Sequence, residues 1–207
     1  MAGIPEPFQL ELSLGVECVA GVDEVGRGPL AGPVVVAAVV LPLPPQPFDV
    51  PVNDSKKLTE ARRIELDHQL REDPRVRFAI VERSPAQLDR MNILRATQDA
   101  MREAVLALAP PKPQAALVDG LAFSPFPVPV TFVVKGDGRS ASIAAASILA
   151  KVYRDRLMDE MDLRYPGYGF ARNKGYGTAE HLEGLRRMGP CPIHRYSFGP
   201  VAQPTLF

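Results

Sequence analysis

Apolar positions in the first part of the chain form strand-like runs and then follow helical spacing. Two segments rich in Val and Ala, Glu17–Val25 and Gly32–Leu41, predict strands on either side of the glycine-bearing turn Gly26–Pro29. Helical spacing predicts a helix over Thr59–Leu70, and alternation of apolar residues predicts a third strand over Arg75–Val81.

The rest of the chain alternates predicted helices with short apolar strands. Ser84 and Pro85 begin a helix in the favoured way, with proline just inside the cap. The later elements are helices at Asn92–Leu108, Ser140–Leu163 and Thr178–Met188, and strands at Ala115–Val118 and Val130–Val134. This order predicts an α/β fold, with helices packed on a sheet. Residues after Pro190 are expected to be irregular, with 199–207 as a flexible tail.

Length and composition are those of an ordinary globular enzyme. The 207 residues, 46% hydrophobic and 23% charged, are enough to bury a core, so we expect a single domain over 1–207. No apolar run reaches the roughly 18 residues of a transmembrane helix, and the acidic N-terminus does not resemble a secretory signal. Cys18 and Cys191 are interpreted as buried or idle thiols. We expect a cytoplasmic monomer.

The formal net charge is zero, but the charges are unevenly distributed. Residues 1–134 carry 13 Lys and Arg against 17 Asp and Glu, a balance of −4, and residues 135–207 carry 11 against 7, a balance of +4. A basic C-terminal third could form a phosphate-binding face. Solvated helices produce the same asymmetry, so charge alone does not establish a nucleic-acid partner.

Four acidic residues occupy unusual positions in apolar segments. Asp23 and Glu24 lie inside a predicted strand, whereas Asp119 and Asp137 each follow a strand and precede glycine. Turn chemistry alone explains either Asp-Gly pair. Adjacent acids in a strand, however, point to opposite faces, so Asp23 or Glu24 must meet apolar surroundings. A buried carboxylate is costly unless it is paired, hydrogen-bonded or bound to a metal.

Carboxylates that converge on one edge of a sheet suit a hard cation such as Mg²⁺ or Mn²⁺. Two such ions, about 3.5–4 Å apart, can activate a water and stabilise the leaving oxygen in phosphodiester hydrolysis. The sequence therefore suggests metal-dependent cleavage of a phosphodiester.

A competing motif lies in the first turn. Gly26–Ala31 fits the G-x-G-x-x-A variant of the dinucleotide-binding turn, which must open directly into a helix. Here Gly32–Val36 contains a proline and strand-forming valines. The dinucleotide-binding interpretation therefore fails its structural requirement.

Short motifs follow one another in order along nearly the whole chain. The first is GVDEVGRGPLAGP at Gly21–Pro33. The others are DSKKL at Asp54–Leu58, NILRAT at Asn92–Thr97, VDG at Val118–Gly120, KGD at Lys135–Asp137, SIAAASILAK at Ser142–Lys151, KGYGT at Lys174–Thr178 and HRYSF at His194–Phe198. This ordered set resembles the bacterial type II ribonucleases H.

The resemblance implies an RNase H-like fold, a central mixed β-sheet flanked by helices with a helical C-terminal part. It implies that Asp23, Glu24, Asp119 and Asp137 are the catalytic carboxylates and hold two ions of Mg²⁺ or Mn²⁺. The implied activity is endonucleolytic hydrolysis of the RNA strand of RNA–DNA hybrids, with cutting at single ribonucleotides embedded in duplex DNA. The ends left would be 3′-hydroxyl and 5′-phosphate, and the implied duty is ribonucleotide excision repair.

A fifth acidic residue, Asp155, is a rival for the fourth ligand position. It lies about 22 Å along its predicted helix from the start, at about 1.5 Å per residue. It cannot share a metal pair with Asp137 from there, so we expect Asp155 to be a surface or ion-paired residue.

The resemblance also implies substrate contacts. Gly26, Arg27 and Gly28 match the loop whose backbone meets the ribonucleotide 2′-hydroxyl, and glycines allow such close approach. Tyr176 matches the tyrosine that stacks on the following sugar. In isolation a half-buried core tyrosine would be the better interpretation, but the flanking glycines and the neighbouring Lys174 are unusual for a core. The implied phosphate contacts are Lys56, Lys135, Ser140, Lys151 and Lys174.

Asn173 departs from the family pattern, because many relatives have histidine there. Asparagine can cap a turn but cannot transfer a proton, so no essential histidine is assigned to the site. His68 is expected on a surface helix, His181 on a helix face, and His194 in a structural role.

Two alternatives remain for the function. Another nuclease of the same fold, transposase-like or junction-cutting, would share the carboxylates but not the Gly26–Gly28 loop and Tyr176. A catalytically dead nucleic-acid-binding module would not need all four carboxylates.

The last five residues suggest a partner. Gln203–Phe207 resembles the Gln-x-x-Leu-Phe peptide by which bacterial replication and repair proteins dock on the DNA sliding clamp, with Gln203, Leu206 and Phe207 matching. Pro204 departs from the usual leucine, and a frayed tail is the alternative.

Overall fold

A five-stranded sheet in the order β3-β2-β1-β4-β5 forms the centre of the computed structural model, which describes residues 8–44 and 58–202. The strands are β1 (Val19–Val25), β2 (Val34–Val40), β3 (Arg77–Arg83), β4 (Ala115–Asp119) and β5 (Val130–Val133). β2 is antiparallel to β1 and β3, whereas β4 is parallel to β1 and β5 is parallel to β4. The predicted strands are all present, and the sheet is mixed.

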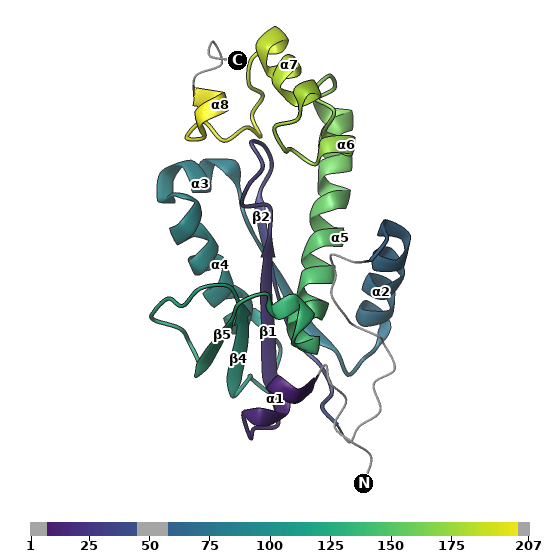
Figure 1. Cartoon of the computed structure of the whole chain (residues 1–207), viewed down its shortest axis with the longest axis vertical. Coiled ribbons are helices and arrows are strands. Elements are labelled where there is room, and N and C mark those ends of the chain that lie inside the picture. The colour runs from purple at the N-terminus through teal and green to yellow at the C-terminus, as the bar shows by residue number, and fades with distance from the viewer. Residues whose placement is uncertain (1–7, 45–57, 203–207) are drawn as a thin grey trace.

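Helices lie on both faces of the sheet (Figure 1). The helices of the described residues are α1 (Gln9–Ser13), α2 (Glu60–Glu72), α3 (Pro85–Met91), α4 (Ile93–Ala107), the 3-10 turn η3 (Gly136–Gly138), α5 (Ala141–Arg164), α6 (Phe170–Asn173), α7 (Ala179–Met188) and α8 (Gly199–Ala202), and the last three lie beyond the end of the sheet. α5 and α2 share one apolar core with the sheet, and α4 shares the other. Thr59, Ser84, Ser140 and Thr178 each cap a helix by accepting a backbone hydrogen bond.

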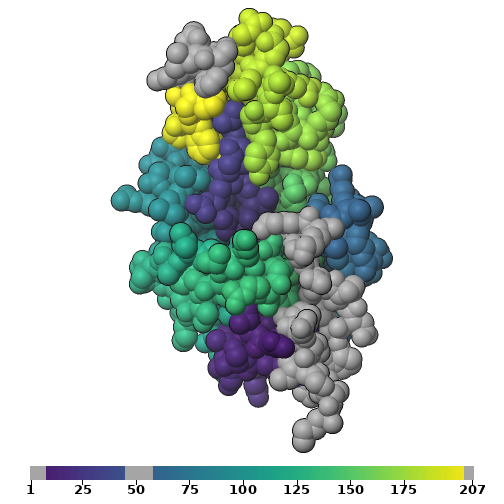
Figure 2. All heavy atoms as spheres, in the orientation of Figure 1, coloured from purple at the N-terminus to yellow at the C-terminus, as the bar shows by residue number. Residues whose placement is uncertain are grey.

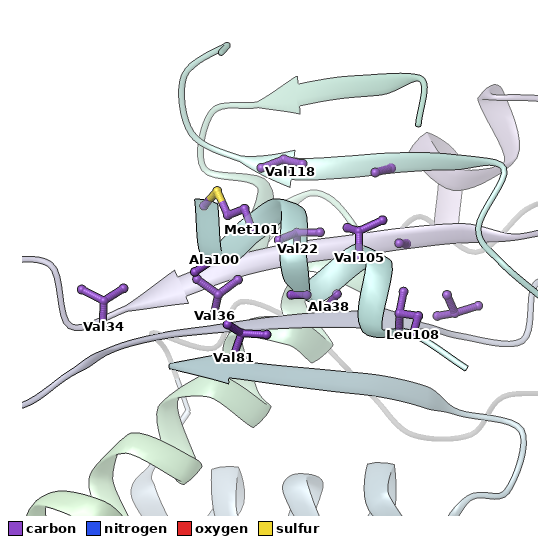
Figure 3. Packing of buried hydrophobic residues seen from close by; sticks show 14 of the residues in the cluster. Val22, Val34, Val36, Ala38, Val81, Ala100, Met101, Val105, Leu108 and Val118 are labelled. Atoms are coloured by element: carbon purple, nitrogen blue, oxygen red, sulfur yellow. The ribbon is translucent and has the colours of Figure 1, made fainter. Parts of the chain in front are cut away.

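Strand β2, which lies between β3 and β1, contributes to both cores, because successive side chains of a strand point to opposite faces. Even-numbered residues from Val34 to Val40 belong to the core shared with α4 (Figure 3). Odd-numbered residues from Val35 to Leu41 belong to the core shared with α5 and α2. Burial on both faces explains why this strand reads as an unbroken apolar run.

The first turn of α5 lies directly against β1. A Cβ atom at Gly21 would stand 2.1 Å from the carbonyl carbon of Ser142, so only glycine fits there. This contact fixes the start of α5 beside the strand that carries Asp23 and Glu24.

The C-terminal part is helical, as expected, but three short helices were not predicted. α1, α6 and α8 have five residues or fewer and therefore show no helical periodicity. α8 occupies the first four positions of the segment expected to be a flexible tail, and its Val201 is buried with Leu30 and Phe170 in a third apolar cluster. No helix within residues 8–44 and 58–202 is long and apolar enough to cross a membrane.

Candidate active site

Three of the four predicted carboxylates lie at the ends of two neighbouring strands. Asp23 and Glu24 are close to the end of β1, and Asp119 is the last residue of β4. Because β1 and β4 are parallel, with Val22 opposite Val118, Asp23 and Asp119 are the next residues on adjacent strands. The sheet therefore brings these carboxylates to one edge.

Each of these carboxylates is held by a donor of the protein. Asp23 is 5% exposed, and its Oδ1 accepts a 2.8 Å hydrogen bond from the Glu24 amide. The Asp119 Oδ1 accepts one of 2.6 Å from the Gly136 amide. The Glu24 carboxylate pairs with the Arg27 guanidinium at 3.2 Å.

Burial makes negative charge at this edge costly. It raises the pKa of Asp23 well above its ordinary value, and the neighbouring Glu24 and Asp119 raise it further. The Ser147 hydroxyl works in the opposite direction by donating to the Asp23 carboxylate. Burial also raises the pKa of Glu24, although the Arg27 charge lowers it. A divalent cation would relieve both the desolvation and the repulsion, and the all-oxygen donor set suits Mg²⁺ or Mn²⁺.

Asp137, the fourth predicted carboxylate, lies in η3 and is 3% exposed. It directly follows Gly136, whose amide binds Asp119, so a backbone link joins the two acids. Within residues 8–44 and 58–202, no three acidic, histidine or cysteine side chains are arranged closely enough to hold a metal ion. Like charges repel, and Asp23, Glu24 and Asp119 each have a donor of their own in the protein.

The glycine loop and Tyr176 form one continuous surface. A Cβ atom at Gly28 would stand 3.4 Å from the Tyr176 Cε1 atom, and the Leu30 amide donates to the Gly175 carbonyl. Tyr176 is 48% exposed, so it is not a core residue. The loop emerges between the yellow C-terminal segment and the green α6–α7 segment (Figure 2). It leads into β2 rather than into a helix, as the proline and the strand-forming valines of Gly32–Val36 predicted.

The predicted phosphate contacts have different surroundings. Lys135 is exposed, and no described acid pairs with it. Lys151 pairs with Asp155 at 2.7 Å, which confirms the ion-paired role of that acid, and Lys174 pairs with Asp159. Lys56 lies outside the described residues.

Ser140 faces inward, unlike the exposed Lys135. It is 2% exposed, and its hydroxyl donates to the buried Glu11 of α1 at 2.6 Å while capping α5. This placement favours a helix cap over a phosphate contact.

Asn173 and the histidines have structural rather than catalytic surroundings. Asn173 is 7% exposed and closes a turn, since its side chain donates to Tyr168 and accepts from Gly175. His68 is on the surface of α2, as expected, and His194 is fully buried, which agrees with the structural role expected of it.

Some residues around the site were not predicted. Ser147 lies one turn after Ile143, which packs at the Gly21 contact, so helical spacing could have placed it beside β1. The fully buried Glu11 gave no signal, because α1 is too short to show a pattern. A cavity of about 170 Å³ lies between α4 and the acidic edge, and Glu24 and Asp119 are among the residues that line it. No sequence pattern predicted this cavity.

An acidic pair on the central strand, with a third carboxylate on the adjoining parallel strand, places the protein in the class of ribonuclease H-like nucleases. The family model for ribonuclease HII matches residues 20–201. A ribonuclease HII of Desulfitobacterium hafniense (strain Y51) is 53% identical over 186 residues, 89% of this chain and 70% of that protein. The chain belongs to the ribonuclease HII family, as the ordered motifs predicted.

Solved structures agree with this assignment. The RNase HII in the PCNA:RNase HII complex from Archaeoglobus fulgidus is 29% identical with a TM-score of 0.73, covering 87% of this chain and 95% of that chain. Bst-RNase HIII in complex with Mn²⁺ shares the fold, with a TM-score of 0.74 at 21% identity over 99% of this chain and 74% of that one. The protein is a hydrolase, a ribonuclease H-type endoribonuclease that acts on RNA–DNA hybrids.

Proposed function

We propose that the protein cuts duplex DNA at single embedded ribonucleotides as well as the RNA strand of longer hybrids, leaving 3′-hydroxyl and 5′-phosphate ends. The main support for this proposal is that only a few residues of the chain separate the acidic edge from the glycine loop. Glu24 and Gly26 are two residues apart, and Tyr176 stands against Gly28. A phosphate at the carboxylates would therefore lie beside a surface that can test the neighbouring sugar.

The proposed reaction uses two divalent cations, Mg²⁺ or Mn²⁺. Asp23, Glu24, Asp119 and Asp137 would hold the ions. When bound, such ions activate a water and stabilise the departing 3′ oxygen. The structure of Bst-RNase HIII with Mn²⁺ supports this ion class for the fold. The buried edge would keep the carboxylates in place and limit the access of bulk water.

The loop and Tyr176 would select the sugar. Backbone groups of Gly26, Arg27 and Gly28 would contact the 2′-hydroxyl, which is the group that separates RNA from DNA. The Tyr176 ring would pack on the next deoxyribose. Lys135 would position a phosphate without reading a base, which suits an enzyme indifferent to sequence.

The remaining proposed phosphate contacts require rearrangement. Lys151 and Lys174 would have to exchange their aspartate partners for phosphate, and Lys56 is proposed from its motif alone.

Cleavage of a duplex that carries one ribonucleotide, beside an all-DNA duplex of the same sequence, tests the proposal. We expect a single cut at the ribonucleotide with Mg²⁺ or Mn²⁺ and none in the control. Cleavage of both duplexes would favour a nuclease that does not read the sugar, and binding without cleavage would favour a catalytically dead module.

We also propose that the protein is a cytoplasmic monomer that docks on a DNA sliding clamp through Gln203, Leu206 and Phe207. These three residues lie outside the described part of the chain. The relative from Archaeoglobus fulgidus, solved in complex with PCNA, supports a partner of this kind.

A further inference from the structure

Two fully buried arginines hold the loop that follows β1. Arg154 and Arg195 are 0% exposed, and within the described residues neither forms an ion pair. Their guanidinium groups donate instead to backbone carbonyls. Burial lowers the pKa of Arg195 to about 9 and that of Arg154 to about 10, so the fold bears a large desolvation cost to keep both cations there.

Arg195 binds both ends of the loop. Its guanidinium donates to the carbonyls of Gly26 and Arg27 at the start and, at 3.0 Å, to that of Gly32 at the end. Its own amide donates to the Leu30 carbonyl at 2.9 Å. One side chain from the C-terminal segment thus fixes the shape of the whole turn.

This arrangement decides where the loop amides point. In a trans peptide the N–H is directed opposite to the preceding carbonyl. With the Gly26 and Arg27 carbonyls turned inward to Arg195, the amides of Arg27 and Gly28 point away from it. No acceptor for either amide is found in the part of the chain that the structure describes. Two adjacent outward N–H groups can together bind one oxygen.

Arg154 joins this loop to the segment of Tyr176. It donates to the carbonyls of Ala31 and Pro33 on one side and to that of Lys174 on the other. It also explains Gly26, where a Cβ atom would stand 2.3 Å from the Arg154 Nε atom.

We infer that Arg195 is a positioning residue for sugar recognition, holding the Arg27 and Gly28 amides in place to bind the 2′-hydroxyl. The inference rests on the proposed function of the loop. Arginine suits the role because its planar fork reaches several carbonyls at once, whereas lysine offers a single point charge. A lysine at 195 would keep the charge and release at least one end of the loop.

The test compares Arg195→Lys with the wild type and with a matched control, Arg83→Lys. Arg83 is also buried, but it pairs with Asp99 and Glu103 on α4. On a duplex with one ribonucleotide, we expect Arg195→Lys to lower kcat roughly 10- to 100-fold while KM stays within about threefold, because phosphate contacts are kept. Arg83→Lys should keep the wild-type kcat even where it lowers the melting temperature.

The outcomes separate the two proposals. A wild type that does not distinguish the ribonucleotide from deoxyribonucleotide would refute the function of the loop itself. A wild type that does, together with a folded Arg195→Lys of near-normal kcat, would refute only the role of Arg195. An equal loss in Arg83→Lys would show a general effect of destabilisation and would also overturn the inference.

A measurement on the wild type covers the case in which Arg195→Lys does not fold. Residue-resolved hydrogen exchange should show the Arg27 and Gly28 amides exchanging rapidly in the free enzyme. The duplex with one ribonucleotide should slow their exchange, and the all-DNA duplex should not. Amides protected in the free enzyme, or slowed equally by both duplexes or by neither, would contradict the inference.

Discussion

At the scale of single residues, the proposal gives the carboxylates and the substrate-binding groups different tasks, because the carboxylates would hold the metal ions. We expect Asp23→Asn or Asp119→Asn to abolish cleavage while hybrid binding persists, because Lys135 and the glycine loop do not depend on either acid. Loss of a ligand charge removes several kcal/mol of transition-state stabilisation, about tenfold in rate per 1.4 kcal/mol. Single-turnover cleavage and a binding titration of the same variant measure the two effects. Near-normal turnover with Mg²⁺ or Mn²⁺ would refute the assignment.

Tyr176 offers a second test at this scale. Its half-exposed ring stands against Gly28, so removing it should not open a core cavity. We expect Tyr176→Ala to keep a native circular dichroism spectrum and to lose most of its activity at a single ribonucleotide, through misplacement of the phosphate. An unfolded variant would instead show that the ring is needed for stability, and Tyr196→Ala, at a similarly exposed tyrosine, provides the control.

The difference between predicted and observed site residues has a physical basis. Asp23 and Glu24 could be predicted, because a charged residue inside an apolar strand can be recognised from its immediate neighbours in the sequence. Arg154 and Arg195 could not, because their partners are backbone carbonyls more than 100 residues away along the chain for most of these bonds. Backbone carbonyls are the same in every sequence and leave no pattern.

At the scale of elements, periodicity predicted the long helices and the strands. Helix α5 was expected over Ser140–Leu163 and spans Ala141–Arg164, since a capping serine and an Ala-rich sequence define it. The short helices α1 and α8 were not predicted, because they have too few residues to show a helical period. The order of strands in the sheet also required the structure, as pairing between distant strands is set by the global packing.

Two buried histidines connect α7 to the C-terminal segment, and their hydrogen bonds define the tautomers. The Tyr176 carbonyl requires a proton on the Nδ1 of His181, which makes its Nε2 an acceptor. The His194 Nε2 must then be the donor across the 2.9 Å contact, and its Nδ1 accepts from the Cys191 amide. A further proton on either ring would place two N–H groups face to face.

This pair should make the fold sensitive to acid. Burial lowers the pKa of His194 to about 4 and also lowers that of His181, whereas both are near 6.5 in an unfolded chain. The unfolded state therefore binds more protons between these values. For His194 the stabilisation is complete above pH 6.5 and is lost as the pH falls toward 4, by up to about 1.4 kcal/mol per pH unit, and His181 acts in the same direction.

Urea unfolding of the wild type and of His194→Gln between pH 7.5 and 4.5 measures this effect. The raised pKa values of Asp23 and Glu24 act in the opposite direction in both proteins and cancel in the difference. We expect the variant to be less stable at pH 7.5 and its stability to depend less steeply on pH. Parallel curves for the two proteins would rule out the histidine pair as the cause.

At the scale of the whole molecule, part of the basic excess of the C-terminal third is used within the fold. The pairs that Arg172, Lys174 and Arg186 form with acids of the same segment are already counted in the balance of +4. Arg154 and Arg195 are buried, so two of the excess charges are not available to phosphate. Weak intrinsic attraction to DNA would make a tether to a DNA-bound partner useful.

The proposed clamp contact provides such a tether and can be tested directly. Burying Leu206 and Phe207 would contribute roughly 1.5–3 kcal/mol each, while ordering the backbone costs about 1–2 kcal/mol per residue, so the net affinity should be weak. Its benefit would come from a raised local concentration on DNA. We expect purified clamp to bind the full chain but not a chain ending at Val201, nor the double variant Leu206→Ser, Phe207→Ser, which leaves α8 intact. Cleavage of a short free duplex should be unchanged in both. Equal clamp binding by all three proteins, or by none, would exclude the tail as the docking peptide.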